Sequence, residues 1–138
     1  MHTPTTVRVL GYAGLLPFVI CALLLARETS YPALVNITAS AYAFGIICFL
    51  VGTWWGMGYS TDNRLVILLS NAYFLVALLF FLVLPSWWPF AASVLLIGAF
   101  VLEQNRTLFP SLPAYYRTMR AILTLVSSGS MLVVFIYG

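Results

Sequence analysis

The sequence predicts an all-α protein, a single bundle of five transmembrane helices. Of its 138 residues, 63% are hydrophobic and only 7% are charged, and the mean hydropathy is +1.06. A soluble domain carries roughly 25% charged residues, so this chain has too few to cover a water-exposed surface. Apolar runs of about twenty residues, the length needed to cross a bilayer, recur along the chain. The polar intervals between them have only the length of loops, so we expect residues 1–138 to form one transmembrane domain.

The five helices are predicted over residues 7–26, 36–59, 64–84, 87–104 and 112–137. Pro17 should kink the first helix, because a proline leaves the carbonyl four residues before it without its N–H partner. Pro32 is expected in the loop before the second helix. Residues 60–63, Ser-Thr-Asp-Asn, supply turn formers and an N-cap for the third helix. Pro113 suits the first turn of the last helix.

The arginines predict the orientation of the bundle. All six basic residues are arginine, and five crossings place five of them on one side of the membrane: Arg8, Arg64, Arg106, Arg117 and Arg120. Arg27 alone lies on the other side. The positive-inside rule then puts the N-terminus in the cytoplasm and the C-terminus in the periplasm of a bacterial inner membrane.

The charge and the rare side chains restrict the possible functions. The net charge of +3 favours contact with anionic membrane lipids, since nucleic-acid binding needs a basic stripe exposed to water. His2 is the single histidine, which leaves no pair for haem and no base for a Ser–His–acid triad. Cys21 and Cys48 lie in apolar runs and should remain reduced. We expect no cofactor, no metal site and no enzymatic activity.

Glu103 is the most informative of the three acidic residues. It lies about 24 Å along the fourth helix, at 1.5 Å per residue, just inside the cytoplasmic boundary of the hydrocarbon layer. A carboxylate there should pair with a cation, and three are available on the same side: Arg106, Arg117 and Arg120. We expect an ion pair that joins the last two helices. The alternative is a site for a lipid headgroup or another anion, built from the surplus arginines.

Asn71 is the deepest strongly polar side chain of the third helix. A buried amide needs a hydrogen-bond partner, so we expect a bond to a neighbouring helix. The alternative is that Asn71 orients a ligand in a cavity with aromatic walls, formed by Tyr42, Trp54, Trp55 and Tyr73. Trp87 and Trp88 are expected at the membrane interface, where tryptophan is enriched.

Small residues predict how the helices pack. Gly52 and Gly56 form a GxxxG motif in the second helix, and the first helix carries Gly11 and Gly14. We expect a central second helix that packs tightly on the first, because small residues allow close approach in lipid. The alternative is a homodimer contact through Gly52 and Gly56.

Three stretches in order along the chain carry a family resemblance. Residues 11–18 (GYAGLLPF), the aromatic and glycine positions of residues 42–56, and residues 116–124 resemble the transmembrane protein 69 family. Its members are small bacterial membrane proteins and mitochondrial relatives, grouped under a domain of unknown function. The resemblance implies a compact five-helix membrane domain and supplies no activity or catalytic residue. Residues 57–59 (MGY) are similar to a segment of the translocator-protein family, a likeness that concerns only the five-helix architecture.

These observations predict a non-enzymatic membrane protein that binds through its cytoplasmic half. Its partner would be a lipid, another lipophilic small molecule or another membrane protein. The candidate ligand-binding residues are Trp54, Trp55, Asn71, Tyr73, Glu103, Arg117 and Arg120. The alternative is a small oligomeric transporter or channel, and the oligomeric state stays open.

Overall fold

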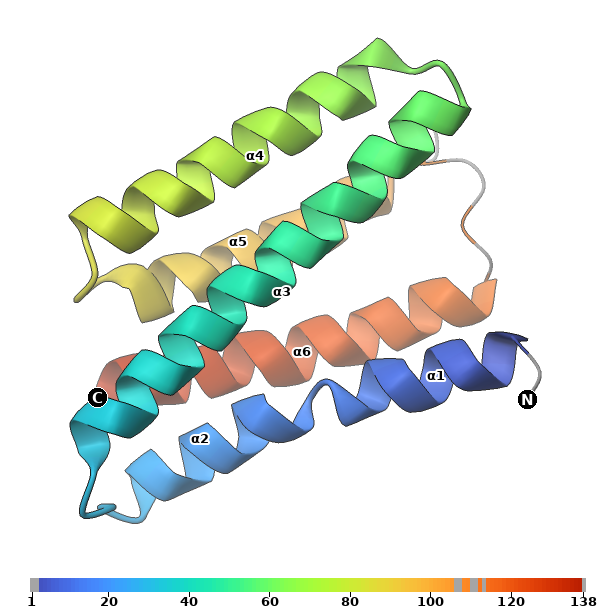
Figure 1. Ribbon diagram of the computed structural model, residues 1–138. Coiled ribbons are helices and arrows are strands. Elements are labelled where there is room, and N and C mark those ends of the chain that lie inside the picture. The colour runs from blue at the N-terminus through green and yellow to red at the C-terminus, as the bar shows by residue number, and fades with distance from the viewer. Residues whose placement is uncertain (1–2, 106–107, 110–111, 113, 138) are drawn as a thin grey trace.

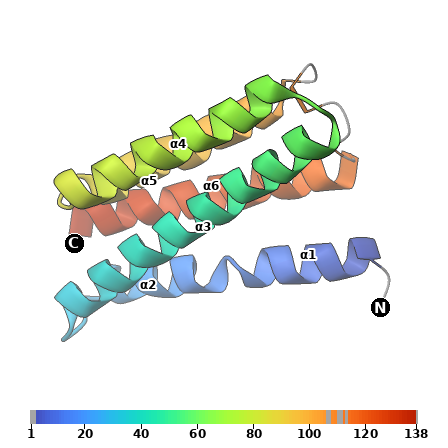
Figure 2. The ribbon, with the colours of Figure 1, turned by 45° about the horizontal axis from the view of Figure 1, so that its top comes forward.

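A computed structural model describes residues 3–105, 108–109, 112 and 114–137. In these residues all regular secondary structure is helical, in six segments (Figure 1): α1 (Thr3–Ala13), α2 (Leu16–Ala26), α3 (Pro32–Ser60), α4 (Arg64–Val83), α5 (Trp88–Glu103) and α6 (Ala114–Tyr137). The helices lie side by side along a common direction, with α3 diverging from α1 toward the end of the bundle that holds the N-terminus (Figure 2).

The first predicted helix is two helices, α1 and α2. The bend expected at Pro17 is a complete break at Gly14 and Leu15, the two residues before the first turn of α2. A break in the middle of a membrane span leaves backbone groups in need of partners. The hydroxyl of Tyr42, on α3, donates to the carbonyl oxygen of Gly14 at 2.7 Å and satisfies one of them.

Two helix starts lie four residues before the predicted ones. α1 begins at Thr3 rather than at residue 7, and α3 begins at Pro32 rather than at residue 36. Pro32 is the first residue of α3, a position where a proline loses nothing, because that N–H has no partner inside the helix. The loop predicted at Pro32 is therefore shorter than expected. Pro113 lies outside the described residues.

The reversals after α2 and α3 share one geometry. Glu28 and Asp62 both have a left-handed backbone, with φ of 55° and 54°. Each follows a helix end at which two N–H groups bond back to the last carbonyls, as in a Schellman motif. Asn63 then caps the next helix, since its side-chain oxygen accepts from the backbone N–H groups of Leu65 and Val66. α4 begins at Arg64, as predicted.

α3 is the central helix, in contact with α2, α4, α5 and α6. Its buried face repeats every three or four residues, through Ala39, Ala43, Ile47, Leu50 and Trp54. The glycines that were expected on this face lie elsewhere. A Cβ added at Gly52 or Gly56 would meet no atom of the described chain within 4 Å, so their predicted packing within the chain is wrong.

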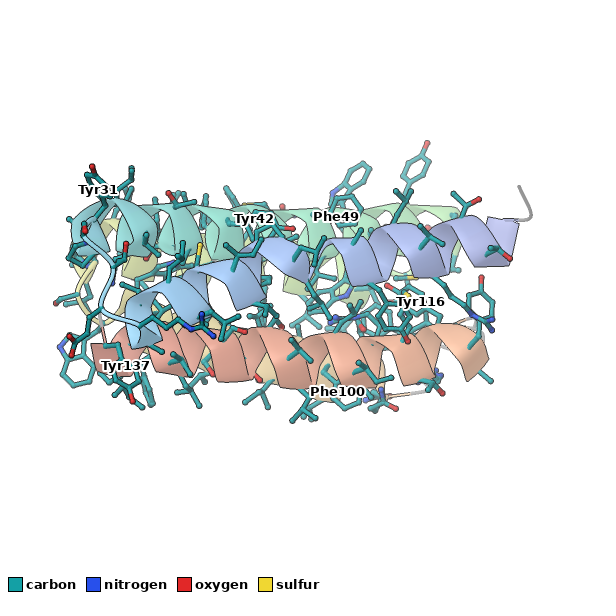
Figure 3. The ribbon with its side chains drawn as sticks, turned by 90° about the horizontal axis from the view of Figure 1, so that it is seen from below. Tyr31, Tyr42, Phe49, Phe100, Tyr116 and Tyr137 are labelled. Atoms are coloured by element: carbon teal, nitrogen blue, oxygen red, sulfur yellow. The ribbon has the colours of Figure 1, made fainter. Side chains whose placement is uncertain are left out.

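The two adjacent tryptophans before α5 have opposite environments. Trp87 is exposed, and its ring lies 5.4 Å from that of Phe135, in the last turn of α6. Tyr31 and Tyr137 lie at one end of the bundle (Figure 3). Trp88 is completely buried, and its indole Nε1 donates to the carbonyl oxygen of Ser40 at 2.9 Å. Trp88 is thus not exposed at the surface, because the turn into α5 points this ring at α3.

The outer surface is apolar, as a lipid-facing surface must be. Large hydrophobic side chains are exposed on every helix, among them Leu34, Leu68, Leu125 and Ile136. Four helical segments are long and apolar enough to cross a membrane: Thr5–Ala26, α3, α4 and α6. α5 is also apolar but has only 16 residues. The chain is a multi-pass membrane protein.

Candidate functional site

A buried polar cluster joins three helices around Glu103, the last residue of α5. One carboxylate oxygen accepts from the indole Nε1 of Trp54, on α3, at 2.9 Å. The other accepts from the Nε of Arg120, on α6, at 2.8 Å. Glu103 is 1% exposed and Arg120 is 5% exposed, so both charges are shielded from the surroundings. The ion pair predicted between Glu103 and an arginine is present, and Trp54 adds the third helix to it.

Arg117 occupies the adjacent turn of α6 and binds main-chain groups. Its two terminal nitrogens donate to the carbonyl oxygens of Glu103 and Phe109, each at 2.9 Å. The Glu103 carbonyl belongs to the last turn of α5, where carbonyls lack partners within the helix. Arg117 and Arg120 are three residues apart and therefore share one face of α6. Arg106 lies outside the described residues.

Aromatic rings enclose the Trp54 side of this cluster. The rings of Tyr73 and Phe109 lie 5.2 Å and 5.5 Å from the ring of Trp54, between centroids. The hydroxyl of Tyr73 donates to the carbonyl oxygen of Leu95, on α5. Tyr73, one of the predicted ligand-binding residues, thus lies beside the cluster. Its hydroxyl also joins α4 to α5.

Two candidate residues lie away from the cluster. Trp55 is exposed on the outer face of α3 and stacks on Tyr59, with 5.7 Å between ring centroids. Asn71 is exposed on α4, and its amide donates to the carbonyl oxygen of Ile67 one turn earlier. Neither the predicted bond to a neighbouring helix nor the alternative place in a cavity holds for Asn71. One donor of the Asn71 amide is thus used within its own helix, a local bond typical of short polar side chains.

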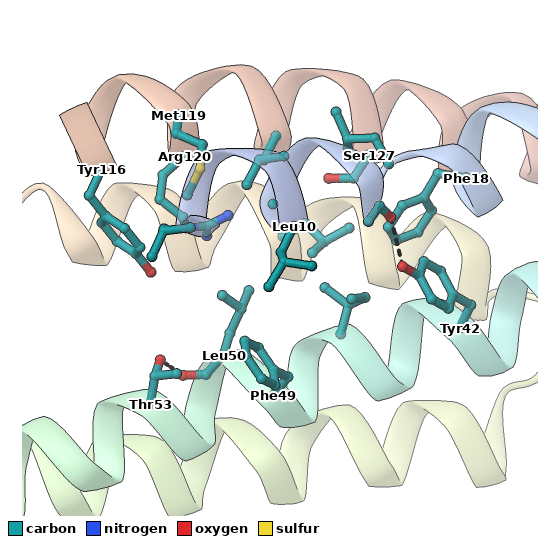
Figure 4. A pocket seen from close by; sticks show the side chains of 17 residues that line it. Leu10, Phe18, Tyr42, Phe49, Leu50, Thr53, Tyr116, Met119, Arg120 and Ser127 are labelled. Atoms are coloured by element: carbon teal, nitrogen blue, oxygen red, sulfur yellow. Dashed lines mark hydrogen bonds between the residues drawn. The ribbon is translucent and has the colours of Figure 1, made fainter. Parts of the chain in front are cut away.

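A pocket of about 530 Å³ lies beside the cluster, between the broken first span, α3 and α6, with one wall from α5 (Figure 4). Its walls are mostly apolar and include Leu10, Phe18, Ile46, Leu50, Leu96 and Leu123. Arg120, Tyr116 and Thr53 lie toward one end of it, and Phe18 and Tyr42 lie toward the other. This volume and this mixture of many apolar groups with few polar ones are typical of small-molecule sites.

Arg120 links the cluster to the pocket. Its Nε is bonded to Glu103, and its side chain extends from α6 into the pocket (Figure 4). Its Nη2 is buried and has no hydrogen-bond partner among the described residues. A buried guanidinium N–H without an acceptor is costly, because it has lost its water and gained nothing in return.

The glycines of the first span form part of this pocket. Gly11 and Gly14 both line it, and a Cβ at Gly11 would lie 2.8 Å from the sulfur of Met119, on α6. Gly11 thus allows α1 to approach α6 closely, whereas Gly14 faces the Tyr42 hydroxyl on α3. The break before Pro17 also lies along the pocket, because Leu15 and Phe18 both line it.

Comparison with known proteins identifies the family. Residues 3–136, almost the whole chain, match a family described as "Protein of unknown function (DUF3429)". The chain belongs to the DUF3429 family. It is also 30% identical over 127 residues to transmembrane protein 69 of Xenopus tropicalis, a match that covers 88% of this chain and 50% of the relative. This DUF3429 chain therefore spans about half the length of that relative. No solved structure matches it.

The DUF3429 site has few groups suited to bond-making chemistry. Within the described part of the chain, no three His, Cys, Asp or Glu side chains are grouped as metal ligands would be. Both oxygens of Glu103 accept hydrogen bonds, which fixes the carboxylate in place as a counter-ion to Arg120. The arrangement can hold an amphipathic molecule, with hydrocarbon along the apolar walls and a hydrogen-bond acceptor at Arg120.

Sequence reasoning missed most of the pocket. It named Arg120 as a candidate ligand-binding residue and Tyr42 as a wall of a cavity around Asn71, but it omitted Thr53, Tyr116 and Met119, which line the pocket. Tyr116 and Arg120 are four residues apart, and Leu123 and Ser127 continue the same face of α6. That spacing was the available signal. An apolar helix of a membrane protein has such a row on every side, so the spacing does not single out this face.

Proposed function

We propose that this protein is a non-enzymatic membrane protein that binds a lipophilic small molecule in the pocket between the broken first span, α3 and α6. The observation that carries the proposal is the apolar pocket of about 530 Å³ with a buried, unpartnered guanidinium nitrogen at one end. An apolar molecule gains affinity from the hydrocarbon walls, and a single polar group at a fixed position orients it.

Access to the pocket from the bilayer supports a lipophilic ligand. Leu10 and Phe49 line the pocket and are nevertheless 67% and 70% exposed. Both therefore lie where the pocket meets the outer surface, which is apolar around them. A molecule dissolved in the membrane reaches such a site without crossing water.

In this proposal the residues of the polar cluster other than Arg120 support the site and do not contact the ligand. Trp54 and Glu103 hold Arg120, and Arg117 ties α6 to the end of α5. Of the seven residues predicted to bind a ligand, Arg120 is the one that lines the pocket. Trp54, Glu103, Arg117 and Tyr73 are given a positioning role, whereas Trp55 and Asn71 are given none.

We propose five crossings, with α5 as the fourth of them. α5 contacts α3, α4 and α6, and its 16 residues rise by about 24 Å, close to a thin hydrocarbon core. From the positions of the arginines we infer that the N-terminus lies in the cytoplasm and the C-terminus in the periplasm of a bacterial-type inner membrane. The polar end of the pocket faces the cytoplasmic side in this orientation.

The experiment is native mass spectrometry of gently extracted protein, with lipid analysis of the molecules that it releases. Thr53→Phe places a ring in the pocket, and we expect it to abolish retention of a stoichiometric small molecule. Thr38→Phe is the matched control. Thr38 and Thr53 lie on α3, and each hydroxyl bonds back to a carbonyl of the preceding turn, but Thr38 is exposed and outside the pocket.

Equal retention by both variants would contradict the proposal. So would wild-type protein that releases only bulk lipids in proportion to their abundance. A second protein that copurifies and is unaffected by Thr53→Phe would instead favour an accessory or assembly function.

A further inference from the structure

The head group of the bound molecule can be deduced from the charges around Arg120. This deduction rests on the proposed function, and it concerns the chemical class of the ligand. We infer that the pocket takes a single-chain amphiphile with an anionic head, whose oxygen accepts from the guanidinium group of Arg120 while its hydrocarbon tail extends toward Phe18 and Tyr42.

The first step is the donor itself. Arg120 bonds to Glu103 through Nε alone, so the guanidinium keeps donors that no described residue uses. A hydrogen bond between two charged groups is roughly twice as strong as one between neutral groups. At a buried guanidinium nitrogen, an oxyanion is therefore a better acceptor than an ester or ketone oxygen.

The second step is the charge balance at this end of the bundle. Glu103 is one carboxylate beside two guanidinium groups, those of Arg117 and Arg120. A third, that of Arg8 on α1, lies over the ring of Tyr115 on α6, 5.0 Å from its centroid. The described charges here sum to a net positive value, and an anionic head reduces it. Attraction between charges is strong where water is excluded.

The third step is the shape of the pocket. It runs along α6 from Tyr116 to Ser127, about 16 Å at 1.5 Å per residue. Beyond Arg120 and Tyr116 its walls become apolar, and the ring of Phe18 packs edge-on against Tyr42 at the far end. An elongated apolar space with its donor at one end fits one hydrocarbon chain with one head.

The test compares probes that share a twelve-carbon chain, added to the purified protein in phosphatidylcholine nanodiscs. Dodecanoate and dodecyl phosphate are the anionic probes, dodecanol is the neutral one and dodecyltrimethylammonium is the cationic one. We expect at least one of the two anions to bind about tenfold more tightly than dodecanol. The cation should bind most weakly. The better of the two anions identifies the head as a carboxylate or a phosphate.

Two conservative variants assign the preference to one residue. Arg120→Lys keeps a cation beside Glu103 but removes the planar fork, and it should reduce the preference for anions to less than about threefold. Arg64→Lys is the matched control, since Arg64 is exposed at the start of α4 and does not line the pocket. It should keep the wild-type preference. Thermal melting of each variant checks that it is folded.

The outcomes separate the inference from the proposed function. Equal binding of dodecanol and both anions to the wild type, abolished by Thr53→Phe, overturns the anionic head and leaves the pocket as a binding site. Loss of preference in Arg64→Lys but not in Arg120→Lys also overturns the inference. Failure of every probe to bind overturns the proposed function as well. The wild-type comparison stands even if Arg120→Lys does not fold.

Discussion

At the scale of single residues, Glu103 determines how α3, α5 and α6 meet. Its two carboxylate oxygens accept from Trp54 on α3 and from Arg120 on α6. Because the pair is buried, the stability that it adds when complete is much smaller than the stability lost when one partner is removed. A complete buried pair contributes little net stability compared with apolar side chains of similar volume, but removing one partner strands the other charge.

Glu103→Gln is therefore expected to destabilise the protein by about 3–5 kcal/mol, the usual cost of leaving a buried charge without its partner. The measurement is reversible unfolding in detergent micelles, with Glu28→Gln as the control at an exposed loop position. The double variant Glu103→Gln with Arg120→Met should be more stable than Glu103→Gln alone, because no charge remains to be stranded. A single variant as stable as the wild type would show that the ion pair does not form in the folded protein.

Arg120 has a second role that its partner lacks. Glu103 uses both oxygens within the cluster, whereas Arg120 keeps a free nitrogen and lines the pocket. The same side chain thus stabilises the bundle through Nε and offers a donor through Nη2. This is why Lys, rather than an apolar residue, is the informative replacement at position 120.

At the scale of helices, α3 shows which small residues matter. Gly58 and Gly52 both belong to α3, but only Gly58 lies against a neighbour. A Cβ at Gly58 would lie 2.8 Å from Cγ1 of Ile67, 3.0 Å from the carbonyl oxygen of Asn63 and 3.1 Å from the backbone nitrogen of Ile67. Two of these atoms are backbone, so α4 itself would have to move.

Gly58→Ala is expected to cost about 1–3 kcal/mol of unfolding free energy through this overpacking. Gly52→Ala, the matched control, should be neutral or more stable by up to about 1 kcal/mol, because alanine favours the helix and the space is open. Both variants are compared by thermal unfolding under one condition. Equal loss from the two would mean that Gly52 also faces a packed neighbour.

At the scale of the whole molecule, the number of crossings decides which loops share a side. The described loops alternate along the bundle, and five crossings place Ser30 and Ser86 on one side of the membrane and Thr61 and Gln104 on the other. If α5 did not cross, Ser86 and Gln104 would face the same side. All four residues lie between helices and are exposed.

Single cysteines at these four positions, in a Cys21→Ala and Cys48→Ala background, test the topology with a membrane-impermeant maleimide. In intact cells we expect labelling at Ser30→Cys and Ser86→Cys, with Thr61→Cys and Gln104→Cys labelled only after the membrane is opened. The parent variant without added cysteines is the control. Labelling of Ser86→Cys and Gln104→Cys from the same side would contradict a fifth crossing.

The break in the first span matters at this scale as well. α1 packs on α6, and α2 packs on both α3 and α6. Gly14 and Leu15, between the two helices, line the pocket. Tyr42 satisfies the Gly14 carbonyl from across the bundle. A straight first span would follow a single direction, whereas the broken one lets α1 stay on α6 while α3 diverges (Figure 2).

The sequence by itself determined the class of the protein, because a chain with so little charge and repeated apolar runs is stable only when embedded in lipid. It also determined the main helical segments, the N-cap at Asn63 and the pairing of Glu103 with an arginine. In each case the residue would cost free energy in the folded state if it had no suitable partner. A buried carboxylate must find a cation, and a helix start must find acceptors for its free N–H groups.

Only the tertiary structure decided which way each helix faces. Trp54 and Trp55 are adjacent, as are Trp87 and Trp88, and in each pair one ring is buried while the other is exposed. One residue along a helix turns the side chain by about 100°. In a soluble protein, polar residues mark the outer face, but lipid accepts apolar side chains on every face. Packing against neighbouring helices therefore chose the buried face, and with it the pocket.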